Sequence, residues 1–177
     1  MRVIAGQLRG RRLHSARVAG LRPTSDRVRE AIFNILGNLV RGARVLDLYA
    51  GTGALAIEAL SRGATTATCV EQNPRARAAL ERNVEALDLD ERLEVVAVDA
   101  LDYCRQIVED GATYDMVFCD PPYATDLEPL VDAVVERDWW MSVCVIEHAA
   151  DWPLSGSAPT GETRRYGDTG VTFFWRK

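Results

Sequence analysis

The sequence of 177 residues has no long apolar run, few histidines and no closely spaced pair of cysteines. No stretch approaches the ~20 apolar residues of a transmembrane helix, and no apolar signal segment follows the arginine-rich N-terminus. We therefore expect a cytoplasmic protein that does not bind a membrane. The four cysteines form no C-x-x-C pair and three lie in apolar runs, which favours buried free thiols. Because only His14 and His148 could join them, we expect no metal site.

The sequence also has no internal repeat, low-complexity segment or long linker, and 47% of its residues are hydrophobic, enough for one buried core. From residue 43 onward, apolar runs alternate with helical patterns, which predicts a mostly parallel sheet with helices on both faces. The expected strands are 43–48, 67–71, 93–98, 114–119 and 141–147, and the expected helices are 53–62, 74–87, 101–109 and 127–136. Residues 162–166 and 171–176 flank a Gly-Asp-Thr-Gly turn, which predicts a final antiparallel hairpin.

Residues 1–40 read as a basic N-terminal hairpin and helix, packed on a main domain of residues 41–177. Segments 2–5 and 11–14 flank a glycine-bounded turn, which indicates a small β-hairpin. A helix-start signal at 23–26 and a stop at Gly37 enclose an apolar stripe at helical spacing: Val28, Ala31, Ile32, Ile35 and Leu36. We expect that stripe to face the main domain and the opposite face, with Arg27, Glu30 and Asn34, to be exposed.

The net charge of −5 conceals a strong asymmetry along the chain. Residues 1–44 hold ten arginines against two acids, a net charge of +8, and the remainder carries −13. Arginine forms bidentate hydrogen bonds with phosphate and stacks on bases, so a local cluster of arginines favours a nucleic-acid-binding surface. The candidate RNA-binding residues are Arg9, Arg11, Arg12, Arg22 and Arg27. A solvated basic arm that only aids solubility is the alternative.

The sequence Asp-Pro-Pro-Tyr at 120–123 follows the apolar run 114–119, so it is expected at the carboxyl end of a buried strand. The Asp120 carboxylate and the Pro121 carbonyl could accept both N–H bonds of a nucleobase amine and turn its lone pair toward an electrophilic methyl group. Tyr123 offers a ring on which a flipped-out base can stack. Taken alone, Asp-Pro-Pro is also an ordinary strand-ending turn.

A second motif, Asp-Leu-Tyr-Ala-Gly-Thr-Gly at 47–53, reads as a strand end, a glycine turn and a helix start. With Ala56 and with Glu71 further on, it also satisfies the fingerprint of a dinucleotide-binding enzyme. Asp47 argues against that reading, because its charge would repel a pyrophosphate but attract the sulfonium and ammonium groups of S-adenosylmethionine.

Together with residues 2–13 and the run Leu-Arg-Pro-Thr-Ser-Asp-Arg-Val-Arg-Glu-Ala-Ile-Phe-Asn at 21–34, these motifs resemble the RsmD family of bacterial small-subunit rRNA guanine-N2 methyltransferases. The resemblance covers essentially the whole chain. It implies a Rossmann-like class I methyltransferase with a seven-stranded, mostly parallel sheet. It also implies S-adenosylmethionine as donor and, as acceptor, a guanine of 16S rRNA in the assembled or assembling 30S subunit. We expect a monomer.

The resemblance also implies roles at the matching positions. Asp47, Gly51 and Gly53 would surround the methionine part of the donor, and Glu71 would accept from the ribose hydroxyls. Asp99 and the Ala100 N–H would meet the adenine, although Asp99 also suits a helix cap. Asp120 and Pro121 would hold the target amine, and Tyr123 would stack on the base.

Three alternatives stay open from the sequence. A dinucleotide-dependent oxidoreductase shares the glycine motif, and a non-catalytic RNA-binding module would need only the arginines. Adenine-N6 methylation of RNA or DNA would use the same Asp-Pro-Pro-Tyr device.

Overall fold

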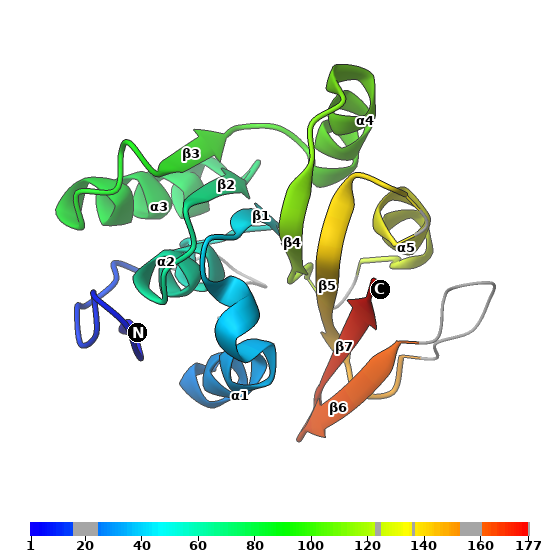
Figure 1. Ribbon diagram of the computed structural model, residues 1–177, viewed down its shortest axis with the longest axis horizontal. Helices are drawn as coiled ribbons and strands as arrows, with labels where there is room; N and C mark the ends of the chain where they lie inside the picture. The colour runs from blue at the N-terminus through cyan, green and yellow to red at the C-terminus, as the bar shows by residue number, and fades with distance from the viewer. Residues whose placement is uncertain (16–24, 123–124, 136, 153–160, 177) are drawn as a thin grey trace.

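The computed structural model describes residues 1–15, 25–122, 125–135, 137–152 and 161–176. At its centre lies a seven-stranded sheet in the order β3-β2-β1-β4-β5-β7-β6 (Figure 1). Neighbours among β1 to β5 pair in parallel, whereas β7 pairs antiparallel with β5 and β6. The strands are β1 Arg44–Leu48, β2 Thr66–Val70, β3 Leu93–Val96, β4 Tyr114–Cys119, β5 Trp140–Ala149, β6 Glu162–Tyr166 and β7 Thr169–Trp175.

Helices cover both faces of the sheet. On one face, α1 (Asp26–Leu36), α2 (Ala54–Ser61) and α3 (Pro74–Ala86) share an apolar cluster with Val45 and Phe118 of the central strands. On the other face, α4 (Ala100–Asp110) and α5 (Glu128–Val134) pack on Leu46 and Val117, because successive strand residues point to opposite sides. A short 3-10 helix, η1 (Gly37–Val40), joins α1 to the sheet. Among the described residues, every helix is too short or too polar to span a bilayer.

This architecture confirms the predicted α/β fold with its C-terminal antiparallel hairpin. The expected elements after residue 43 are present, with small differences at their ends. β5 runs on to Ala149 because it stays paired with Thr169 at the start of β7. β3 ends at Val96 and not at residue 98, because its ladder with β2 stops at Val96. The division into residues 1–40 and 41–177 remains a prediction.

The N-terminal helix begins and ends as predicted, and Val28, Ile32 and Leu36 of its predicted apolar stripe are buried. The Ser25 side chain caps it by accepting from the Val28 N–H at 3.2 Å, and Gly37, with φ of 52°, ends it. Arg27, Glu30 and Asn34 are exposed, as expected. The prediction for Ile35 was wrong: its side chain is 38% exposed, and Phe33 is buried instead, against Phe118 of β4.

Arg29 of this helix is fully buried, so part of the basic charge of residues 1–44 serves the fold. Its guanidinium pairs with Asp26 at 2.9 Å and lies 3.8 Å from Glu58 of α2. It also donates to the carbonyl of Arg2 at 2.6 Å. A buried guanidinium needs such partners, because an unpaired charge in the core is costly.

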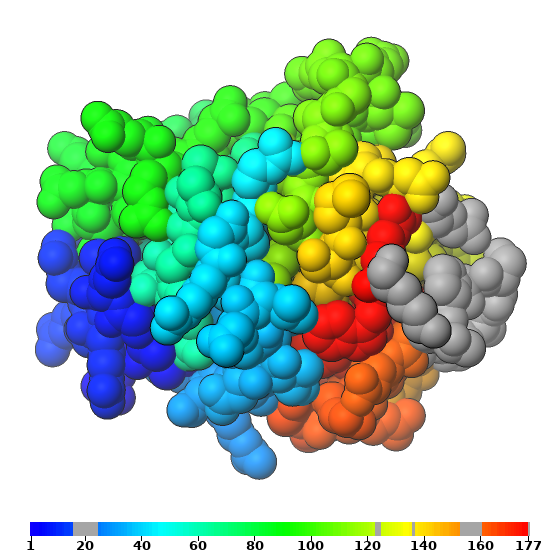
Figure 2. Space-filling model, in the orientation of Figure 1, coloured from blue at the N-terminus to red at the C-terminus, as the bar shows by residue number. Residues whose placement is uncertain are grey.

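The expected N-terminal hairpin takes the form of a loop closed by a single antiparallel bridge. Glu58 of α2 holds this loop by accepting from the backbone N–H groups of Ile4, at 2.8 Å, and Ala5, at 3.0 Å. Gly6 lies so close to the Ser61 carbonyl that a Cβ atom would clash with it. The loop, α1 and the C-terminal hairpin lie along one side of the molecule (Figure 2).

Candidate functional site

Carboxylates from adjacent strands meet at the carboxyl edge of the sheet. Asp47 is the fourth residue of β1, and Glu71 and Asp120 directly follow β2 and β4. The last residues of β2 and β4 both pair with Leu48, so Glu71 and Asp120 lie at the level of Tyr49, on either side of it. The parallel register thus gathers side chains that are far apart in the sequence.

Asp47 is buried, with 1% of its surface exposed. Its Oδ2 accepts from the Ala56 N–H at 3.2 Å, and its Oδ1 has no hydrogen-bond partner among the described residues. Burial raises the pKa of this carboxyl well above its usual range, and the negative charges of Asp120 and Glu71 add to that effect. A cation beside Oδ1 would favour the ionised form.

The glycine turn between β1 and α2 needs residues without a side chain. Gly51 and Gly53 have φ of 58° and 79°, in the region that favours glycine. A Cβ atom on Gly53 would also clash with Leu80 of α3. Both glycines therefore keep the backbone close to the sheet edge, where a ligand can approach it.

Glu71 holds this turn in place. Its Oε2 accepts from the Gly51 N–H at 2.8 Å, and its Oε1 accepts from the Asn73 N–H at 2.7 Å. Asn73 in turn caps α3, as predicted, by accepting from the backbone of Arg75 at 3.0 Å. Each carboxylate oxygen can accept a further bond, so the same group can receive ribose hydroxyls.

Asp99 and Ala100 lie at the same edge, beyond β3. The Asp99 Oδ1 accepts from the N–H groups of Leu101 at 2.8 Å and Asp102 at 3.3 Å, so this residue does cap α4. Its role as an acceptor for the adenine amine remains a prediction, and Oδ2 is the oxygen that would accept. Ala100 is the first residue of α4, where an N–H has no partner within the helix.

Asp120 is half-buried and Pro121 is buried at the end of β4. The two expected acceptors are therefore adjacent at the carboxyl edge, one strand away from Asp47. Tyr123 and Arg22 lie outside the described residues, and their roles stay predictions.

Two further residues of the site were given no role by the sequence analysis, Tyr49 within the glycine motif and Asn83 outside any motif. Tyr49 has φ of 63°, unusual for a residue with a bulky side chain, and burial raises its pKa to about 12, with Cys119 and Asp99 adding to the effect. Asn83 of α3 is buried and donates to the Thr52 carbonyl at 2.9 Å. It also binds the backbone N–H of His14 at 2.6 Å, so it joins the glycine turn to the N-terminal segment.

Of the candidate RNA-binding arginines, Arg9, Arg12 and Arg27 are exposed. Arg11 is exposed too, but its guanidinium donates to the Ala86 carbonyl at 2.6 Å, at the C-terminus of α3. That end of a helix attracts cations, so Arg11 already has a structural role.

The four cysteines are buried and unpaired, as predicted. Within the described residues, no group of three or more His, Cys, Asp or Glu side chains is arranged to hold a metal ion.

The chain is similar to several known proteins. The family model described as Conserved hypothetical protein 95 matches residues 1–175. Ribosomal RNA small subunit methyltransferase D of Haemophilus influenzae is 36% identical over 87% of this chain and 81% of its own length. The Escherichia coli protein of that name is 38% identical over 80% of this chain and 70% of its own. The solved structure of Escherichia coli yhhF matches with a TM-score of 0.84 and 32% identity, covering 100% of this chain and 98% of that one.

These matches confirm the family that the motifs indicated. The chain belongs to the RsmD family, and it is a methyltransferase.

Proposed function

We propose that the protein transfers the methyl group of S-adenosylmethionine to the exocyclic N2 of a guanine in 16S rRNA, within the assembled or assembling small ribosomal subunit. The observation that carries this proposal is the gathering of Asp47, Glu71 and Asp120 at the carboxyl edge of the sheet in a chain of this family. Ligands of open α/β sheets bind at that edge.

The described residues fit a cationic donor. The buried Asp47 Oδ1 lacks a hydrogen-bond partner among them, and its carboxyl is hard to ionise without a positive charge nearby. A pyrophosphate would instead add negative charge beside three carboxylates, which disfavours a dinucleotide. When bound, the donor supplies a sulfonium methyl group. Glu71 would bind its ribose, and Asp99 with the Ala100 N–H would bind its adenine.

At the acceptor side, the Asp120 carboxylate and the Pro121 carbonyl would receive the two N–H bonds of the guanine amine. This orients the nitrogen lone pair toward the methyl group, so direct transfer needs no covalent intermediate on the protein. The N–C bond would form as the S–C bond to that methyl group breaks, the demethylated donor would leave, and the amine would lose one proton to solvent. Tyr123 would stack on the flipped-out base.

The exposed arginines Arg9, Arg12 and Arg27, with Arg22, would contact rRNA phosphates, and Arg11 would contribute less because it is engaged with α3. Action on a ribosomal subunit would place the enzyme in the cytoplasm.

The experiment is methyl transfer from labelled donor to undermethylated 30S particles. We expect label in 16S rRNA with the parent protein and with Asp132→Ala, a matched control on the exposed side of α5. Asp120→Ala should transfer little. Absence of label from rRNA with the folded parent protein would contradict the proposal.

A further inference from the structure

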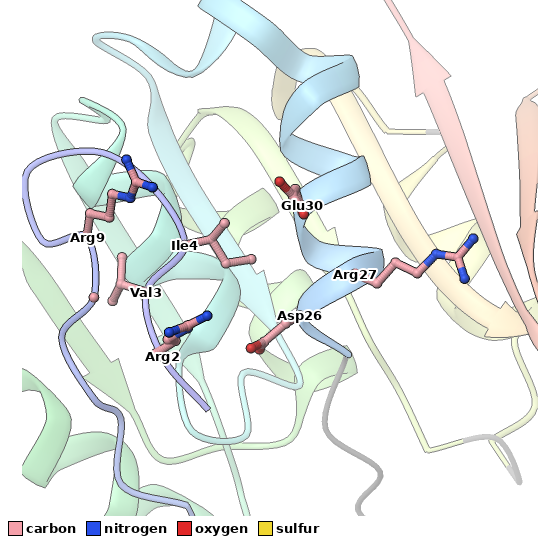
Figure 3. A pocket seen from close by; sticks show the side chains of 8 residues that line it. Arg2, Val3, Ile4, Arg9, Asp26, Arg27 and Glu30 are labelled. Atoms are coloured by element: carbon pink, nitrogen blue, oxygen red, sulfur yellow. The ribbon is translucent and has the colours of Figure 1, made fainter.

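A groove of about 410 Å³ lies between the N-terminal loop and the first turns of α1 (Figure 3). Arg2 and Arg9 line it from the loop, and Asp26 and Glu30 line it from the helix. Arg27 also contributes to the lining, but its guanidinium extends away from the loop (Figure 3). The volume is within the range of small-molecule sites, about 300–1,000 Å³.

Buried contacts hold the two walls of this groove in place. Arg29 donates to the Arg2 carbonyl on the loop and to the Asp26 carboxylate on the helix, at 2.6 and 2.9 Å. The Glu58 carboxylate accepts from two backbone N–H groups of the loop as well. The groove is therefore formed before any ligand arrives, which lowers the entropy cost of binding.

The two walls carry opposite charges and do not close on each other. Within the described part of the chain, no ion pair or side-chain hydrogen bond engages the guanidinium of Arg2 or Arg9 or the carboxylate of Glu30. Cationic groups thus face carboxylates across an open space. A ligand that suits both walls has an anionic end and an end rich in hydrogen-bond donors.

We propose that this groove binds one nucleotide of the substrate RNA, distinct from the methylated guanosine and carrying an amino-bearing base. Its phosphate lies against Arg2 and Arg9, because guanidinium groups match phosphate geometry. The amino edge of a cytosine or guanine lies against Glu30 and Asp26, since carboxylates accept from such amines. Uracil fits worse because its carbonyl oxygens would face the carboxylates. The inference rests on the proposed rRNA substrate and adds a second point of recognition to it.

Neutralising Glu30 tests the proposal, because the direction of the change in affinity for 30S particles distinguishes recognition of a base from simple attraction by charge. Glu30→Gln should bind undermethylated 30S particles about fivefold or more weakly, because glutamine keeps only one acceptor oxygen and lacks the negative charge that strengthens the bond to the base. Arg9→Ala should also weaken binding. Glu109→Gln, the same change on an exposed residue of α4, should bind as the parent does or slightly more tightly. If the groove only attracts RNA by charge, Glu30→Gln will bind more tightly than the parent, and the proposal is overturned.

Short single-stranded RNAs test the base preference without the ribosome. The parent protein should bind a cytidine hexamer more tightly than a uridine hexamer, and Glu30→Gln should lose that preference while keeping its thermal stability. A preference that is absent in the parent, or that survives in Glu30→Gln, overturns the proposal. Methyl transfer by the parent to 30S particles, at saturating donor and particles, tests the proposed function separately.

Discussion

Replacing Glu71 with glutamine separates two roles of one carboxylate. Its oxygens accept from the backbone N–H groups of Gly51, at 2.8 Å, and Asn73, at 2.7 Å. Glutamine has the same shape, but only one of its two terminal atoms is an acceptor. One of the two amides therefore loses its partner and faces an NH₂ group.

The size of the effect follows from those two bonds. Glu71 is 7% exposed, and a buried N–H left without a partner costs about 1–3 kcal/mol. For a chain of 177 residues, that loss in the free energy of unfolding lowers Tm by about 2–12 °C. Donor affinity should fall by at least about tenfold, because the ribose hydroxyls lose a charged acceptor.

Thermal unfolding and calorimetric titration with S-adenosylmethionine measure the two effects separately. The control is Glu81→Gln on α3, whose ion pair with Arg77 at 3.4 Å is largely exposed and contributes less than about 1 kcal/mol. We expect the control to match the parent in donor affinity. A Glu71→Gln variant with the parent's Tm would refute the role in holding the glycine turn. One with the parent's Kd would remove Glu71 from the donor site.

Three further predictions concern charge. Asp120→Ala should lower turnover by about 100-fold or more, while the donor Kd, measured by calorimetry, stays within a few fold. A larger loss in donor affinity than in turnover would contradict the place of Asp120 beside the acceptor base. Asp47→Asn should weaken donor binding but raise the Tm of the donor-free protein. The raised pKa means that ionisation of Asp47 destabilises the folded protein only above the pKa of the unfolded carboxyl, about 4. The gain in Tm should therefore grow as the pH rises above about 4, and a lower Tm at neutral pH would show the reasoning to be wrong. Replacing Arg9 and Arg12 with alanine should make the slope of log affinity for 30S particles against log salt concentration less steep, by about 0.7–0.9 per lost phosphate contact, without changing donor affinity. An unchanged slope would leave the two arginines only a structural or solubility role.

The sheet and the order of its elements could be predicted because local signals agreed with the tertiary fold. The apolar run 114–119 marks a buried strand, and the proline after Asn73 marks the start of α3. The acids that follow each strand then had to meet at one edge, because parallel strands end on the same side. The place where these acids gather, at one edge of the sheet, could therefore be predicted from their spacing alone.

Contacts between distant segments could not be predicted in this way. Helical periodicity does not reveal that Arg29 is buried or that its partner Glu58 lies on another helix. The double role of Glu71 depends on how the glycine turn folds back, and the backbone bonds of Asn83 depend on where the N-terminal segment packs. Such contacts are set by tertiary packing, for which a local sequence pattern carries no signal.

The most direct measurement of the central claim is the identity of the methylated nucleoside. Undermethylated 30S particles are incubated with the protein and isotope-labelled S-adenosylmethionine, and their 16S rRNA is digested to nucleosides for mass spectrometry. The account predicts labelled N2-methylguanosine, formed by the parent protein and nearly absent with Asp120→Ala. Labelled N6-methyladenosine, or label in any nucleoside that Asp120→Ala forms as fast as the parent, would contradict it.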